Sequence, residues 1–179
     1  RDYKVTGVQT CALPISLTGA PSYPNSPTSS APLSGALETP ANFGDNYGQR
    51  LRGFVVPPVT GSYRFWIASD DASTLYLSTD LNPGNKQALA RVDTAVNPRE
   101  WERDAVQKSA SVFLEASRAY YIEILMKEGT GNDHLAVRWL RPDGVDEGPI
   151  PATYLLPANV DFTAPKFVLE PKKIGRAHV

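Results

Sequence analysis

Cysteine, histidine and long apolar runs are all scarce in this chain. The 179 residues contain one cysteine, Cys11, and two histidines, His134 and His178. A single cysteine excludes a disulfide framework within the chain. No apolar run approaches the roughly 20 residues that a membrane-spanning helix requires. The first residues also lack the continuous apolar stretch of a signal peptide.

The two ends of the chain fit no strand or helix pattern. Residues 5–15 and 174–179 can be encoded by nucleotide strings of which one contains the reverse complement of the other. These strings resemble a standard sequencing adapter, whereas two natural ends would rarely share the property. We therefore expect residues 1–16 and 173–179 to be translated adapter rather than native sequence. If the ends are adapter, the remainder is expected to be a piece of a longer chain with neighbouring domains. A natural tail is the alternative to the adapter.

Removing these ends narrows the chemistry that is available. Residues 17–172 contain no cysteine and only one histidine, His134. The lack of cysteine excludes a thiolate zinc site and a cysteine nucleophile. Four of the 18 basic and one of the 19 acidic residues lie in the ends, which leaves a net charge of −4 for residues 17–172. This balance argues against nucleic-acid binding. Any metal would be held by oxygen ligands, which suits calcium or magnesium.

Residues 17–172 contain several short runs with the apolar and polar alternation of β-strands. Residues 17–45 are rich in Pro, Ser, Gly and Thr and predict an extended surface segment. Tyr63, Phe65 and Ile67 then alternate with more polar positions, which is typical of a half-buried strand. Seven or eight such runs predict an all-β antiparallel sandwich or barrel over residues 17–157, with 158–172 as a linker or the start of another domain. The expected strands are 47–56, 61–69, 73–78, 88–92, 109–114, 119–128, 134–140 and 152–156.

The most promising local feature is the pair Asp70-Asp71 in "IASDDASTLYL". It lies between two expected strands, where a sandwich clusters its binding loops. Neighbouring residues of an extended chain point to opposite sides, so both carboxylates can meet one cation only if the backbone leaves the strand conformation there. The alternative is a turn in which one aspartate caps backbone amides and the other is solvated.

A second candidate loop is "KEGTGNDHL", which holds Glu128, Asn132 and Asp133. Its glycines allow tight turns that direct carbonyls inward, as calcium sites often need. An ordinary glycine-rich hairpin loop is the alternative.

Three further features have mainly structural explanations. His134 follows this loop without an obvious partner and fits a surface or hydrogen-bonded position. Trp101 lies in a polar segment and is the best candidate for an exposed aromatic ring that could stack on a sugar. The carboxylates around it could supply a glycosidase acid pair, although a solvated charge run explains them better. They are Glu100, Glu102 and Asp104.

The segments "TGSYRFWIASDDASTLYLSTD", "SASVFLEASRAYYIEILMKEG" and "NDHLAVRWLRPDG" together resemble the PA14 domain family. This family includes the first domain of anthrax protective antigen, yeast flocculin lectin domains and accessory modules of bacterial glycosidases. The resemblance runs from about Leu17 to Pro157. It implies a β-sandwich whose lectin-type members join the aspartate pair by a cis peptide and hold calcium, which binds sugar hydroxyls directly. Members usually begin with a strand whose place here is held by residues of the first 16.

The resemblance implies a calcium-dependent, non-catalytic carbohydrate-binding module of a larger secreted or cell-surface bacterial protein. The alternatives are a structural or protein-interaction module and an accessory fragment of a glycoside hydrolase. The expected metal ligands are Asp70, Asp71, Asn132 and Asp133, and the expected sugar contacts are Glu128, His134 and Trp101.

Overall fold

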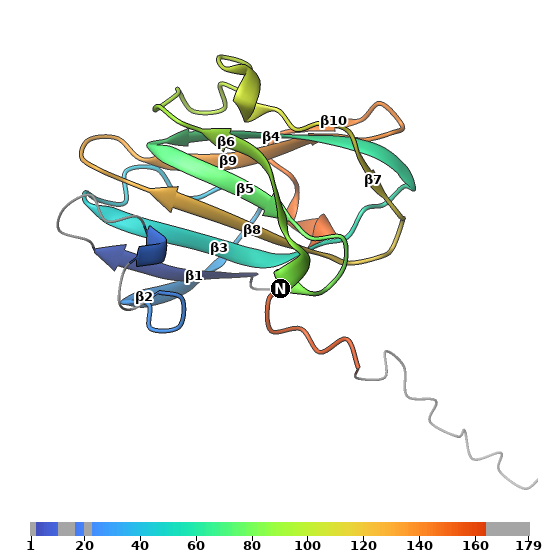
Figure 1. Cartoon of the computed structure of the whole chain (residues 1–179), viewed down its shortest axis with the longest axis horizontal. Coiled ribbons are helices and arrows are strands. Elements are labelled where there is room, and N and C mark those ends of the chain that lie inside the picture. The colour runs from blue at the N-terminus through green and yellow to red at the C-terminus, as the bar shows by residue number, and fades with distance from the viewer. Residues whose placement is uncertain (1–2, 11–16, 20–22, 164–179) are drawn as a thin grey trace, which may run out of the picture.

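The computed structural model describes residues 3–10, 17–19 and 23–163, and within them the fold is all-β. Eleven strands and four short 3-10 turns follow one another along the chain (Figure 1). All described strand pairs are antiparallel, which confirms the predicted fold class. The strands are β1 (Tyr3–Thr10), β2 (Ser29–Leu33), β3 (Tyr47–Val55), β4 (Gly61–Asp70), β5 (Ala72–Leu77), β6 (Gln87–Val92), β7 (Val112–Leu114), β8 (Tyr120–Lys127), β9 (His134–Leu140), β10 (Asp146–Glu147) and β11 (Leu155–Pro157).

The strands form two sheets that pack face to face. The larger sheet has seven strands in the order β2-β1-β3-β8-β5-β6, with β11 also paired to β3. The smaller sheet has four strands in the order β10-β9-β4-β7. Figure 1 shows the smaller sheet above the larger one, with the arrows of β4 and β8 ending on the same side, at the left of the view.

The core between the sheets follows the alternation in the sequence. Tyr63, Phe65 and Ile67 of β4 are fully buried, as are Val137 and Trp139 of β9. Alternating apolar residues of each strand point inward because successive side chains of a strand face opposite sides. Trp139 lies near the middle of this core, with its ring centre 5.1 Å from that of Tyr63.

Three strands lie outside the expected set, and β1 (Tyr3–Thr10) is one of them. β2 falls in the segment predicted to be extended surface chain, and β10 falls in the turn-rich stretch after β9. Each is short and shows no inward-facing alternation of its own, so its pairing depends on the neighbouring strand. Residues 3–10 form β1 between β2 and β3, in the part of the chain where the resemblance led us to expect the place of a native first strand. Their adapter origin stays a prediction, and residues 11–16, 20–22 and 164–179 lie outside the described part of the chain.

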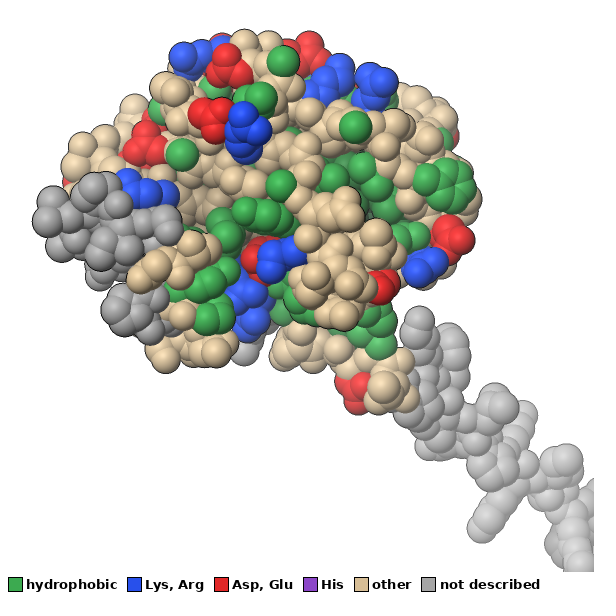
Figure 2. Space-filling view, in the orientation of Figure 1, with side chains coloured by type: hydrophobic (Ala, Val, Ile, Leu, Met, Phe, Trp, Pro, Cys, Tyr) green, Lys and Arg blue, Asp and Glu red, His purple; other side chains and the backbone are tan. Residues whose placement is uncertain are grey.

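The surface carries charges of both signs. Figure 2 shows basic and acidic side chains interspersed over one face of the molecule rather than gathered by sign. Exposed ion pairs join side chains of opposite sign, such as Arg99 with Glu38 and Arg118 with Glu115. Within the described residues, no helix is long and apolar enough to cross a membrane.

The chain crosses from one sheet to the other twice at the same end of the sandwich. β4 belongs to the smaller sheet and β5 to the larger, and Asp71 alone separates them. β8 belongs to the larger sheet and β9 to the smaller, and residues 128–133 connect them. The two candidate loops of the sequence therefore meet at one end of the fold.

The central position of Trp139 yields a first prediction. Trp139→Ala should lower the free energy of unfolding by about 3–5 kcal/mol, because it empties a fully buried site. Urea denaturation measures the change. Phe113→Ala is the control, since Phe113 is 65% exposed and should change stability by less than about 0.5 kcal/mol. Equal losses in both variants would contradict the assigned core.

Candidate metal centre

The aspartate pair forms the corner between the two sheets. Asp70 is the last residue of β4, Ala72 is the first of β5, and the peptide bond between Asp70 and Asp71 is cis. Ser69 donates a hydrogen bond of 2.6 Å to the carbonyl oxygen of Asp71, which fixes the corner from inside. Asp70 and Asp71 are both half-buried.

Glu128 completes an acidic cluster with this pair. One carboxylate oxygen each from Asp70, Asp71 and Glu128 lies within 4.8 Å of the others, the only such group among the described residues. Reciprocal hydrogen bonds hold it together. The backbone N–H of Asp71 donates to Glu128 Oε2 over 3.0 Å, and the N–H of Gly129 donates to Asp71 Oδ2 over 2.8 Å. We call these three residues the acidic cluster.

The electrostatics of the cluster are unfavourable for three free carboxylates. Glu128 is only 1% exposed, and its burial together with the charge of Asp71 raises its pKa to about 7. Burial and Asp71 also raise the pKa of Asp70. Like charges in a poorly solvated place disfavour ionisation. His134 acts in the opposite direction on the pKa of Asp70, but its effect is smaller than those of burial and of Asp71.

Asp133 lies beside the cluster but outside it. Its charge contributes to the raised pKa of Asp70 and of Glu128, yet its Oδ2 accepts a 2.9 Å hydrogen bond from the N–H of Gly44. Asp133 is 1% exposed, whereas Asn132 is exposed in the same loop. The structure thus brings together Asp70, Asp71 and Glu128, while Asp133 also anchors another segment.

That segment is the loop of residues 42–46, which the sequence did not single out. The N–H of Asn42 donates to the carbonyl of Asp133 over 2.9 Å, and the N–H of Asn46 donates to the carbonyl of Gly129. The N–H of Gly131 donates back to Asp45. No local signal could have revealed these contacts, since Gly44 and Asp133 are 89 positions apart. We call residues 42–46 the anchored loop.

The other expected contact residues have structural roles. His134 is buried opposite Asp70 on the paired strand, and its Nε2 lies 2.9 Å from the carbonyl oxygen of Val96. Trp101 is less exposed than expected, because this ring is half-buried and packs against the core. One apolar residue of a charged loop can turn inward, and the role of Trp101 as a sugar contact stays a prediction.

The charge run around Trp101 is used to shape its own loop. Glu100 accepts hydrogen bonds from the backbone and side-chain N–H groups of Asn97. Asp104 and Gln107 form a capping box around the 3-10 turn Ala105–Gln107. These contacts support the interpretation as a structural charge run rather than a glycosidase acid pair.

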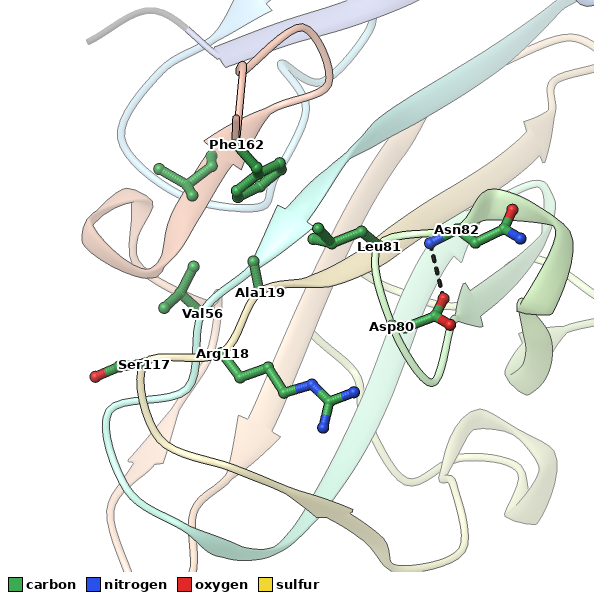
Figure 3. Close-up of a pocket in the computed structure, with 9 residues that line it drawn as sticks. Val56, Asp80, Leu81, Asn82, Ser117, Arg118, Ala119 and Phe162 are labelled. Carbon is green, nitrogen blue, oxygen red and sulfur yellow. Dashed lines mark hydrogen bonds between the residues drawn. The ribbon is translucent and has the colours of Figure 1, made fainter. Parts of the chain in front are cut away.

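A pocket lies at the opposite end of the sandwich from the acidic cluster. Figure 3 shows Leu81 and Phe162 on its walls, with the N–H of Asn82 donating to Asp80. Its volume is about 500 Å³. The Arg118 guanidinium at its edge pairs with Glu115 at 2.7 Å. The charged groups of this pocket are therefore already matched by neighbours, unlike those of the acidic cluster.

The acidic cluster has the donor set of a hard divalent cation. All its ligand atoms are carboxylate oxygens, which are the ligands that calcium prefers. Glu128 Oε1 is buried and has no hydrogen-bond partner among the described residues, and the same holds for Asp133 Oδ1. Buried polar atoms are rarely left without a partner. The carboxylates of the cluster therefore have the chemistry of calcium ligands, whereas the described side chains leave some of their buried oxygens without a partner.

The domain is an antiparallel β-sandwich that carries an acidic cluster where the chain crosses between its two sheets. Within that class the family is clear, because the model of the PA14 domain matches residues 25–152, well over half of the chain. The chain belongs to the PA14 domain family.

Curated relatives match about half of the chain. A region of 99 residues is 39% identical to the mouse (Mus musculus) N-acetyl-beta-glucosaminyl-glycoprotein 4-beta-N-acetylgalactosaminyltransferase 1, and covers 52% of this chain and 10% of that enzyme. A region of 86 residues is 34% identical to mouse Fibrocystin-L, and covers 48% of this chain and 2% of that protein. The chain thus matches a tenth or less of the length of these relatives.

Solved structures confirm the fold. The Epithelial Adhesin 6 A domain of Candida glabrata, solved with Galb1-3GlcNAc, aligns with a TM-score of 0.60 at 12% identity, and covers 88% of this chain and 87% of the adhesin domain. The Epithelial Adhesin 9 A domain of the same yeast, also solved with Galb1-3GlcNAc, aligns with a TM-score of 0.57 at 15% identity, and covers 83% and 85%. At such identities the likeness concerns architecture alone.

The contact between Asp133 and Gly44 yields a prediction that needs no metal. In calcium-free buffer, Asp133→Ala should reduce the hydrogen-exchange protection of the Gly44 amide about tenfold, because the amide loses a carboxylate acceptor. Asp133→Asn keeps an acceptor oxygen and should retain most of the protection. Exchange followed by NMR measures both. Unchanged protection in Asp133→Ala would show that this carboxylate does not anchor the loop.

Proposed function

We propose that this chain is a calcium-dependent carbohydrate-binding domain of a secreted or cell-surface protein. The observation that carries the proposal is the acidic cluster, in which three carboxylates converge with a buried, unpartnered oxygen on Glu128. Membership of the PA14 family and the architecture shared with adhesin domains solved with sugars support the sugar half of the proposal. A bacterial source remains part of the expectation from the sequence.

The cluster residues divide the work of holding the ion. Asp70 and Asp71 present carboxylates from the corner between the sheets, and Glu128 presents one from the second crossing. The backbone N–H groups of Asp71 and Gly129 each occupy one carboxylate oxygen, which leaves the remaining oxygens for the cation. A bound calcium ion has 6–8 ligand positions, so positions not filled by protein can take the hydroxyl oxygens of a sugar.

The domain is proposed to bind rather than to catalyse. The acidic residues outside the cluster that the sequence raised as a glycosidase pair are engaged in loop capping, as Glu100 and Asp104 show. A hydrolase needs a second carboxylate across the scissile bond, and the cluster places its three carboxylates around one point. Hydrolysis of glycosides by the isolated domain, lost on Glu100→Gln, would contradict this part of the proposal.

Calcium titration by calorimetry tests the metal half. We expect saturable binding that weakens by more than about tenfold in Asp71→Asn and Glu128→Gln, because each removes a negative ligand while keeping the side-chain shape. Asp143→Asn and Glu115→Gln are matched controls at the other end of the strands, where these carboxylates pair with Arg141 and Arg118. Equal affinity in all four variants would place the ion elsewhere.

A glycan array read with calcium and again with chelator tests the sugar half. The wild-type domain should bind a subset of glycans in calcium, and the signal should disappear in EGTA and in Asp71→Asn. Glu115→Gln should keep the wild-type profile, since its carboxylate lies away from the cluster. Binding that survives EGTA would remove calcium from the mechanism. Absence of any glycan signal would favour a structural or protein-interaction module.

A further inference from the structure

The pocket opposite the acidic cluster presents an apolar wall. Leu81 is 41% exposed, and Figure 3 shows its side chain extending toward the middle of the pocket, with the Phe162 ring on another wall. A single exposed leucine needs no explanation, but apolar side chains gathered around a concave space of about 500 Å³ are typical of binding sites. We call this space the Phe162 pocket. Its lining is Val56, Asp80, Leu81, Asn82, Ser117, Arg118, Ala119, Leu156 and Phe162.

The charged groups at the rim of the Phe162 pocket are already engaged. Arg118 Nη1 lies 2.7 Å from Glu115 Oε2. The two carboxylate oxygens of Asp80 accept hydrogen bonds of 2.7 Å from the N–H of Asn82 and of 2.8 Å from the side-chain amide of Asn85. The pocket therefore offers an occupant mainly its apolar wall, which suits an apolar chain segment better than a small charged ligand.

The chain itself leads to this pocket. After β11 it turns through a hydrogen bond of 3.1 Å from the N–H of Val160 to the carbonyl of Pro157. The Phe162 ring then packs edge-on against Phe54 of β3, with the ring centres 4.8 Å apart. Phe162 is thus attached to the larger sheet and lines the pocket at the same time. The described part of the chain ends one residue later, so the sequence that follows starts at the pocket.

The sequence that follows has a composition suited to this wall. Residues 164–172 read "APKFVLEPK", in which three consecutive apolar residues stand between Lys166 and Glu170. Three adjacent apolar side chains are rarely left exposed unless they serve a contact. Four Cα–Cα steps lead from residue 163 to Phe167 and span at most about 14 Å, which is enough for the chain to return to the wall that Phe162 forms.

We propose that residues 164–172 fold back onto the domain and place Phe167, Val168 and Leu169 in the Phe162 pocket. This inference does not depend on calcium or sugar binding. A short tether gives the apolar residues an effective concentration in the millimolar range, so a weak contact is enough to keep the pocket filled. In a longer chain, the domain that follows would be held at the end opposite the acidic cluster, and the cluster would face away from it.

The position of Phe162 favours this segment over a separate partner. A free peptide or a second copy of the domain would have to enter beside the chain that already forms one wall, whereas residues 164–172 continue from that wall. The segment carries one basic and one acidic residue next to its apolar triplet, and the rim carries one of each as well. No excess of like charge therefore opposes the contact.

NMR spectroscopy of the full chain tests the contact directly. In the wild type we expect NOEs between the Leu81 methyl groups and the ring protons of Phe167. Phe167→Ser should remove these NOEs and shift the methyl signals of Leu81 and Ala119, because the pocket loses its aromatic occupant. Phe43→Ser is the matched control, since Phe43 is 58% exposed in the anchored loop at the other end of the fold, and it should leave both methyl signals unchanged.

Limited digestion with trypsin gives a second readout. Trypsin cuts after lysine, so docking should protect the bond between Lys166 and Phe167. Leu81→Ser should speed this cut about tenfold, because it removes part of the apolar wall and raises the undocked fraction. The melting temperature should stay nearly unchanged, since Leu81 is 41% exposed. Cutting after Lys172 in the same variant should change by less than about twofold, because this bond lies beyond the apolar triplet.

The outcomes separate this inference from the proposed function. Absence of the NOEs in the wild type, with identical Leu81 signals in wild type and Phe167→Ser, would overturn the docking and leave the acidic cluster untouched. Phe167→Ser changes no residue of the described sandwich, so unfolding would not explain such a result. Leu81 signals that change with protein concentration, together with a dimer in sedimentation, would assign the pocket to a second copy instead. Equal cutting after Lys166 in wild type and Leu81→Ser would also overturn the docking.

Discussion

The single-residue crossing at Asp71 is the constraint from which the site follows. The chain leaves one sheet at Asp70 and enters the other at Ala72, so the position of Asp71 is set by the two strands on either side. Both carboxylates are therefore positioned by the cores of two sheets rather than by a loop of their own. The second crossing, after β8, starts on the strand that pairs with β5, and so Glu128 arrives at the same corner. The acidic cluster is a consequence of topology.

The cost of gathering carboxylates is met in part by the backbone. The N–H groups of Asp71, Gly129 and Gly44 each face one carboxylate oxygen, which stabilises the charged forms locally. The raised pKa values of Asp70 and Glu128 show that these hydrogen bonds are insufficient. The unpartnered oxygens left over belong to Glu128 and Asp133, on the side of the cluster that the second crossing supplies. A divalent cation is the chemically simplest complement to such a set.

The sequence predicts the parts of this structure that depend on local pattern. Alternation around Phe65 and Val137 marks core strands, and the position of Asp70 and Asp71 between two strands marks the corner. The parts it misses depend on contacts between distant segments. Nothing near Gly44 announces that its N–H meets Asp133, and the polar neighbours of Trp101 conceal a ring that turns toward the core. Glu128 could be suspected from its loop, but only the crossing shows that it joins the pair.

The acidic cluster and the anchored loop are held in place by different contacts. The acidic cluster is fixed by both sheets, so substitutions there disturb the corner itself. The anchored loop is fixed mainly through backbone groups, at Asn42, Gly44 and Asn46. Its side chains, Phe43 among them, are free to vary without changing those hydrogen bonds. Side chains of the anchored loop can therefore change while the carboxylates of the acidic cluster stay as they are, which is how functions are grafted onto a common scaffold.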